Sequence, residues 1–290
     1  MPVGLTVLDI DTDIINPLNT NTVDVNGAKI KLDFSLGSVH IGNTDMNPIP
    51  SGSVIIGSQA ALNLIGNNNI AIGHYAMLNS NISTNNVCVG TSAGTNIVDT
   101  VGNTLIGDNS GGNIISGVGN TTLGNSAGLS VTTGNQNVFI GDNSGASLPS
   151  ITGSNVICIG KESNPTSGTV SNEITLGNSS ITTLRCQATS ITSLSDARDK
   201  TNIEDSEYGL DLVNSLKPVK FEWNTRDGAK KDVKDLGFIA QDLKEVDDEY
   251  LGLVYDENPE KLEASYGRLI PVLVKAIQEL SEEVKQLKSK

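Results

Sequence analysis

The chain has 290 residues, a formal net charge of −14 and only 3% aromatic residues. Without a basic face, such an acidic chain is not expected to bind nucleic acid. We also expect no membrane insertion, because no run of about 18 apolar residues exists. A secretory signal is not expected either, because the first residues carry acids where a signal has bases.

Charge density divides the sequence at residue 195. The 194 residues before it carry 15 charged side chains, whereas the 96 residues from there on carry 37. A break of this kind favours two domains of different character. We predict a repeat region at 38–194 and a small domain at 195–290, preceded by a segment at 1–37.

The N-terminal segment 1–37 contains candidate strands at residues 23–25 and 30–34. We interpret this segment either as an attachment to a virion or as a cap of the repeat region. The sequence leaves both interpretations open.

A glycine that follows an apolar, any, apolar triplet recurs through the repeat region. It stands at Gly42, Gly57, Gly73, Gly90, Gly107, Gly124, Gly141, Gly160 and Gly177. Most intervals between these glycines are 17 residues, and the others are 15, 16 and 19. A fixed period with one strand and one turn in each unit predicts a β-solenoid.

Each triplet predicts a short strand with one buried face. The first and third positions carry Ile, Val, Leu or Thr, and the period of two in a strand directs this pair inward. The middle position, which includes Cys88 and Cys158, is then expected to face outward and to pack between coils or chains. An asparagine that precedes the triplet is expected to turn the chain, because Asn tolerates positive φ. These asparagines are Asn69, Asn86, Asn103, Asn120 and Asn137.

Coils of about 17 residues are thin, and this favours assembly of several chains. Two inward residues per coil bury little apolar surface against a backbone entropy cost of about 1–2 kcal/mol per residue. We therefore expect several chains to pack about a common axis, as a homotrimer. The motif at residues 69–76 resembles the head repeats of trimeric bacterial autotransporter adhesins. The resemblance spans residues 38–180 and implies a trimer of left-handed parallel β-rolls, while the longer period leaves an intertwined triple-stranded β-helix open.

The sequence predicts no metal site, no cofactor and no disulfide framework. Cys88, Cys158 and Cys186 are far apart and include no CxxC pair, and His40 and His74 are the only histidines. We expect reduced thiols of low reactivity, because thiolate formation needs an electropositive setting that this acidic region lacks.

From residue 195 onward the pattern predicts a small α/β domain. Residues 209–216 form a short amphipathic helix that stops near Pro218, and residues 219–223 alternate as a strand. Asp227 and Gly228 mark a turn, and residues 237–243 predict a strand that runs into a helix.

The C-terminal end carries an apolar heptad seam. Its members are spaced by three and four residues in alternation and comprise Ile270, Leu273, Ile277, Leu280, Val284 and Leu287. β-branched residues at a with Leu at d are typical of dimers. We give more weight to the long repeat array, which can fix the chain number, and predict a trimeric coiled coil. Pro271 is expected in the first turn of this helix or just before it.

Four motifs occur in order between residues 195 and 290. They are Ser195-Asp196-x-Arg198-x-Lys200-x-Asn202-Ile203, then Leu216-Lys217-Pro218-Val219-x-Phe221-x-Trp223-Asn224, then Gly237-Phe238-Ile239-Ala240-Gln241-Asp242, and Tyr266-Gly267-x-Leu269-Ile270-Pro271 with Ala276-Ile277-Gln278-Glu279-Leu280. Together they resemble the self-cleaving intramolecular chaperone domain, peptidase family S74, that ends many phage tail spikes and fibres.

This resemblance implies a domain that trimerises the preceding β-structure and then cuts itself off. By position, Ser195 is the nucleophile, Lys200 is its base, and the bond between Leu194 and Ser195 is cleaved. Residues i and i+5 of an α-helix lie about 140° apart around its axis, so the two side chains cannot meet on a continuous helix. The segment must turn back between them.

A lysine acts as a base only when its pKa, ordinarily about 10.4, is lowered. Burial and a neighbouring cation such as Arg198 act in that direction. The carboxylates of Asp196 and Asp199 act against it if they face the amine. The orientation of these two acids is therefore part of the mechanism.

The fold class expected is mainly β, a trimeric β-solenoid with a small C-terminal α/β chaperone domain that ends in a coiled-coil helix. The function expected is a viral or phage-type fibre or spike, made in the host cytoplasm and placed on the virion. Candidate partners are two further copies, a virion base structure and a host receptor or glycan.

Three alternative functions compete with the fibre. A bacterial surface adhesin is suggested by the head-like repeats, but no signal peptide or membrane anchor is recognised. A membrane-tethered transcription factor with the same chaperone requires a DNA-binding domain and a membrane helix, neither of which is recognised. A glycan-cleaving spike needs paired carboxylates, and no such pair is readable among the acids of the repeat region. These acids are Asp99, Asp108, Asp142, Glu162 and Glu173.

Overall fold

The computed structural model describes residues 21–25, 28–33, 37–42, 50–187 and 192–290. The chain divides into two compact units, Met1–Asn178 and Ser179–Lys290. The regular repeats thus end before residue 179. The candidate strand position Phe34 lies outside the described residues.

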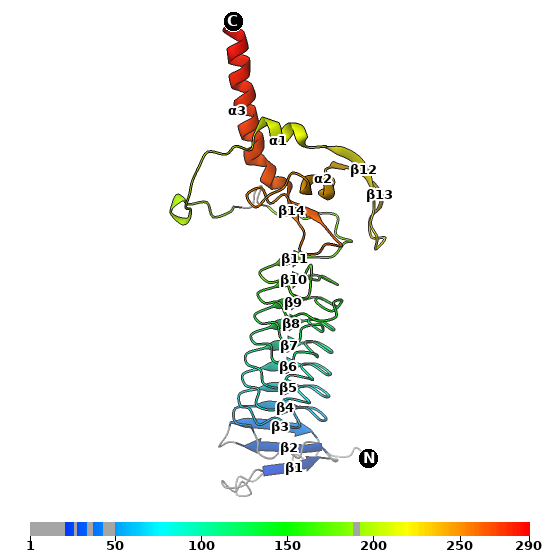
Figure 1. Ribbon diagram of the computed structural model, residues 1–290. Helices are drawn as coiled ribbons and strands as arrows, with labels where there is room; N and C mark the ends of the chain where they lie inside the picture. Colours follow the sequence, from blue (N-terminus) through cyan, green and yellow to red (C-terminus); the bar gives the residue numbers. More distant parts are fainter. Residues whose placement is uncertain (1–20, 26–27, 34–36, 43–49, 188–191) are drawn as a thin grey trace. The chain divides into compact units, whose positions relative to one another are not determined.

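The first unit is one sheet wound into a β-solenoid of about eight turns. Its strands are β1 (Asn21–Val25), β2 (Ala28–Asp33), β3 (Ser38–Gly42), β4 (Val54–Ile56), β5 (Ile70–Ile72), β6 (Val87–Val89), β7 (Thr104–Ile106), β8 (Thr121–Leu123), β9 (Val138–Ile140), β10 (Ile157–Ile159) and β11 (Ile174–Leu176). They stack in sequence order, with β1, β2 and β3 antiparallel and all later neighbours parallel (Figure 1).

The register of the parallel sheet follows the sequence repeat. Val87 pairs with Thr104, and Thr104 pairs with Thr121, so each strand residue meets its equivalent one coil further along. All of this pairing occurs within one chain. The solenoid is therefore wound by a single chain, and the intertwined triple-stranded alternative is not the fold adopted.

The predicted orientation of the strand residues is wrong. It is the middle position of the triplet that points into the coil, and its members are fully buried: Ile55, Ala71, Cys88, Leu105, Thr122, Phe139 and Cys158. The flanking positions lie on the outer surface, where Ile106 is 36% and Leu123 is 47% exposed. Cys88 and Cys158 consequently face the interior, and the expectation that they point outward is corrected.

The reason lies in the rest of the coil. The interior is lined by small and apolar side chains from the remaining legs of each turn, such as Ala93, Ile97, Ile114 and Val131, which form one continuous core with the middle strand residues. Because each coil is thin, its interior has room for only one side chain from each strand beside the side chains from the rest of the coil. The two flanking residues are therefore excluded from the core.

The asparagine before each triplet also has a different role from the one expected. None of the five has a positive φ; their side chains are fully buried and stack from coil to coil. In each step the side-chain oxygen of one asparagine accepts a hydrogen bond from the backbone N–H of the next, as from Asn103 to Asn86 at 2.9 Å. The chain turns instead at neighbouring residues such as Asn85 and Ser92, with φ values of 58° and 56°.

The second unit contains short helices and two-stranded ribbons. Its elements are the 3-10 helix η2 (Ala197–Asp199), α1 (Leu210–Ser215), β12 (Val219–Asn224), β13 (Lys231–Gly237), α2 (Ala240–Lys244), β14 (Val254–Tyr255), β15 (Glu263–Ala264), the 3-10 helix η3 (Tyr266–Arg268) and α3 (Leu269–Lys288). Pro271 lies in the first turn of α3, as expected.

A small core holds this unit together. Leu243, Leu251, Leu253, Leu269 and Val272 are buried in it, and partly buried residues of α1 pack against them. The Glu279 carboxylate on α3 accepts a hydrogen bond of 2.7 Å from the Leu210 N–H at the start of α1. This bond satisfies one of the free donors at a helix N-terminus and fixes α1 against α3.

Candidate active site at residues 195–200

The candidate site is a tight turn between Ser195 and Lys200. Asp196 precedes η2 and caps it, because its side chain accepts a 2.9 Å hydrogen bond from the Arg198 N–H. Lys200 follows η2 in an extended conformation, with φ −126° and ψ 146°, and its N–H binds the Ala197 carbonyl. The chain thus reverses within three residues, as the i to i+5 spacing required.

The turn brings the two predicted catalytic side chains into contact. Lys200 Nζ donates a hydrogen bond of 2.7 Å to Ser195 Oγ. In the neutral form of the amine the same contact can run in the opposite direction, with the hydroxyl as donor. This is the geometry required of a nucleophile and its general base.

Arg198 holds the first acid of the turn. Its guanidinium donates to both oxygens of Asp196, with Nε 3.0 Å from Oδ1 and Nη2 2.6 Å from Oδ2. These bonds lower the pKa of Asp196 and raise the pKa of Arg198. Within the described part of the chain, no carboxylate lies at ion-pair distance from Lys200. Of the two acids that could oppose the base, Asp196 is therefore already paired.

The site is open to solvent in the single chain. Ser195 and Lys200 are both exposed, and Leu194, whose carbonyl carbon Ser195 would attack, is 84% exposed. Neither side chain is buried by its own chain. Exposure leaves the backbone accessible, but it does not supply the desolvation that helps a lysine to act as a base.

The predicted seam residues lie on an exposed stripe of α3. All six, Ile270, Leu273, Ile277, Leu280, Val284 and Leu287, are exposed. An adjacent face at the start of the helix carries Leu269, Val272 and Ala276, which are buried. Helix α3 therefore has two apolar faces, one of which packs into its own unit and one of which has no cover in this chain.

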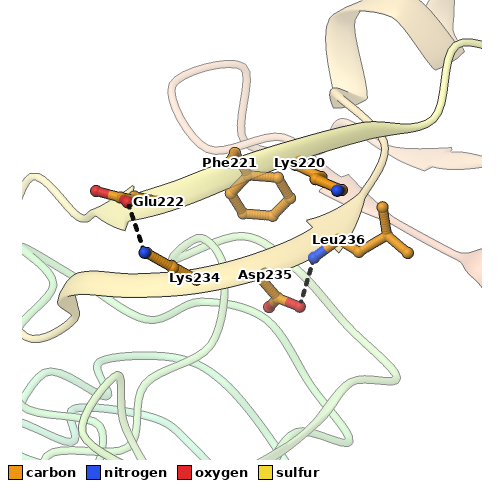
Figure 2. Close-up of a pocket in the computed structure, with 6 residues that line it drawn as sticks. All are labelled: Lys220, Phe221, Glu222, Lys234, Asp235 and Leu236. Atoms are coloured by element: carbon orange, nitrogen blue, oxygen red, sulfur yellow. Dashed lines mark hydrogen bonds and ion pairs between the residues drawn. The ribbon is translucent and has the colours of Figure 1, made fainter.

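A polar cluster on the β12–β13 ribbon was not predicted from the sequence. Trp223 Nε1 donates a 2.9 Å hydrogen bond to Asp235, and Lys230 Nζ lies 4.2 Å from the centre of the Trp223 ring. The bond from Trp223 is the main cause of a lowered pKa of Asp235. Figure 2 shows the shallow pocket of this ribbon with Phe221 between the strands and the ion pair of Glu222 with Lys234.

The three cysteines form no disulfide in the structure. Burial raises the pKa of the Cys88 and Cys158 thiols, whereas Cys186 is exposed. Among the described residues no group of three or more His, Cys, Asp or Glu side chains is arranged to hold a metal ion. In the same residues no helix is long and apolar enough to span a membrane.

Comparison with known proteins finds one family match, in the first part of the second unit. Residues 195–252 match the model of the Peptidase_S74 family, described as the chaperone of endosialidase. This family implies self-cleaving peptidase activity in general. Searches of curated proteins and of solved structures found no match. Residues 195–252, which follow the β-solenoid, are therefore similar to the Peptidase_S74 family, the chaperone of endosialidase, and the match begins at Ser195.

Proposed function

We propose that the second unit drives assembly of a homotrimeric viral fibre or spike and then cleaves the bond between Leu194 and Ser195. Ser195 is the nucleophile and Lys200 the general base. The observation that carries this proposal is the 2.7 Å contact between Lys200 Nζ and Ser195 Oγ, at the first residue of the family match.

The reaction balances with these two residues and one water. Neutral Lys200 takes the hydroxyl proton while Ser195 Oγ attacks the carbonyl carbon of Leu194. The C–N bond breaks, the proton passes to the leaving α-amine of Ser195, and an ester joins Leu194 to Oγ. Water then hydrolyses the ester, which leaves a carboxylate on Leu194 and a free amine on Ser195.

Two uncovered apolar surfaces support the homotrimer. The exposed stripe of α3 repeats with the spacing of a coiled-coil seam. The flanking residues of the solenoid strands, such as Ile106 and Leu123, form rows that continue from coil to coil. Long apolar surfaces on a soluble protein usually mark contacts. Because both run along repeating elements, further copies of the same chain are the partners that match them in length and period.

Assembly also supplies what the exposed dyad lacks. Neighbouring copies would desolvate Lys200 and so favour its neutral form. Cleavage would then follow correct assembly rather than precede it. A solenoid of this kind with such a chaperone is typical of tail fibres and spikes, so we assign the mature chain to the virion, with host attachment as its role.

The dyad is tested with two variants and two matched controls. Ser195→Ala and Lys200→Ala should each leave an uncleaved chain of 30.3 kDa on a denaturing gel. Ser193→Ala and Lys217→Ala remove a nearby exposed hydroxyl and an exposed amine of the same unit and should cleave normally. Two fragments from either site variant would refute the assignment.

The trimer is tested in the uncleaved Ser195→Ala background. Light scattering should give three times the chain mass. An added Ile277→Asp change places a charge on the α3 stripe and should reduce the trimer fraction, whereas Gln278→Asp, one position away, should not. A monomeric Ser195→Ala protein would contradict the proposed assembly.

A further inference from the structure

The Asp196–Arg198 pair occupies the turn that separates the two dyad residues. Arg198 Nε lies 3.0 Å from Oδ1 and 3.2 Å from Oδ2, and Nη2 lies 2.6 Å from Oδ2. The guanidinium therefore covers both oxygens of one carboxylate. Such bidentate pairs fix geometry more firmly than single contacts.

The position of Asp196 makes this pairing relevant to Lys200. The two residues stand at opposite ends of η2, and a 3-10 helix rises about 2.0 Å per residue, so the lysine side chain can span the distance. A carboxylate beside an amine favours the ammonium form. An unpaired Asp196 would therefore compete with Ser195 for Lys200 and keep the amine protonated.

The other charged groups around the amine are few. On its own segment Lys200 is flanked by Asp199, and Arg198 lies one residue further back. From the other described elements, no side chain forms an ion pair or a hydrogen bond with Nζ. Ser195 Oγ is the one hydrogen-bond partner recorded for Nζ within those residues. Asp196 and Asp199 are thus the acids whose placement decides the state of the base.

We propose that Arg198 is a positioning residue that holds the Asp196 carboxylate away from Lys200 and so leaves the amine available to Ser195. This inference rests on the proposed self-cleavage. It explains how Asp196 can lie four residues before Lys200 without favouring the protonated form of the Lys200 amine. It also gives Asp196 two separable tasks, since its Oδ1 caps η2 through the Arg198 N–H while its charge is neutralised by the Arg198 side chain.

The test compares pH profiles of cleavage in the full chain. Each protein is purified in denaturant and refolded by dilution at pH 5 to 9. The rate of fragment appearance is divided by the assembled fraction, which cross-linking measures in the same samples. Arg198→Gln keeps the backbone cap and frees the carboxylate, so its profile should move to higher pH and its rate at pH 7 should fall about tenfold.

Two double variants separate this mechanism from a general charge effect. Arg198→Gln with Asp196→Asn restores the net charge, keeps the capping oxygen and should recover the wild-type profile. Arg198→Gln with Asp199→Asn restores the same net charge at the other acid and should not recover it. An unchanged profile in Arg198→Gln, or equal recovery by both double variants, would overturn the inference.

A single variant covers the case in which Arg198→Gln does not assemble. Asp196→Asn retains the cap and leaves the Arg198 cation near Lys200 without its carboxylate partner, so its profile should move to lower pH. A profile that stays in place or moves upward would overturn the inference. If the wild-type chain is not cleaved at any pH, it is the proposed function that fails, and the two failures are thereby distinguished.

Discussion

Asn103 is the middle member of the buried asparagine ladder, and its removal tests how the coils are held together. Its Oδ1 accepts from the Asn120 N–H at 2.8 Å, and its Nδ2 donates to the Gly117 carbonyl at 2.9 Å. Asn103→Ala removes the side-chain oxygen and nitrogen that bind these two backbone groups. The Asn120 N–H and the Gly117 carbonyl are then left buried without the hydrogen bonds that the side chain supplied.

The expected cost follows from these two groups. Leaving a buried donor or acceptor unpaired costs about 1–3 kcal/mol, so the pair costs about 2–6 kcal/mol. Each 1.4 kcal/mol is about tenfold in an opening equilibrium. Local opening of the coils around Asn103 should therefore become at least about 30-fold more frequent.

Amide hydrogen exchange read by mass spectrometry measures this opening in the assembled protein. Peptides that cover β7 and β8 should lose protection in Asn103→Ala, while peptides of the second unit should not change. Asn113→Ala is the matched control, because this asparagine is exposed and should cost less than about 0.5 kcal/mol. Unchanged protection in Asn103→Ala, or an equal loss in the control, would refute a stabilising role of the ladder.

Two further predictions concern the solenoid interior and its cysteines. Gly124→Ala should destabilise the coils, because φ is +135° there and a Cβ would lie 2.7 Å from the Gly141 carbonyl oxygen; an unchanged thermal midpoint would argue against this close approach. A thiol reagent at pH 8 should label one cysteine per native chain, Cys186, and three after unfolding, because burial raises the pKa of Cys88 and Cys158 and withholds their thiolates. Labelling of all three in the native protein would contradict the fold.

The repeat could be predicted from the sequence because its glycines are structurally required. Gly90 has a φ of 138°, which side chains rarely adopt, so the residue recurs wherever the strand ends. From the regular spacing of these glycines, the positions of the strands and their parallel order could be predicted. The orientation of the strands could not be fixed, because a triplet such as Val87, Cys88 and Val89 is apolar at all three positions. Size gave no clue either, because the middle position holds residues as different as Ala71 and Phe139.

The second unit was predicted where its pattern was regular. The strand at residues 219–223 and the helix at 209–216 correspond to β12 and α1. Strand β13, which follows β12 in the chain, was missed. Its sequence is charged and its residues before Gly237 are exposed, so it has no alternating apolar face. The strand expected at the start of residues 237–243 is absent: Gly237 ends β13, Phe238 and Ile239 lie in no helix or strand, and the remaining residues belong to α2.

Ser195 and Lys200 were singled out by the motif, and the need for a turn between them followed from helix geometry. The pairing of Asp196 with Arg198 could not be predicted, because spacing alone does not say which of two nearby cations an acid will bind. A guanidinium offers a planar pair of donors that suits a carboxylate, whereas an ammonium does not. The structure assigns the acid to Arg198 and leaves Lys200 to Ser195.

Mass spectrometry of the purified protein tests self-cleavage at Ser195 most directly. The account predicts two polypeptides, one that ends at Leu194 and one whose free N-terminus is Ser195, and it predicts a single intact chain for Ser195→Ala. An uncleaved wild-type chain of 30.3 kDa, or a new N-terminus at any other residue, would contradict it.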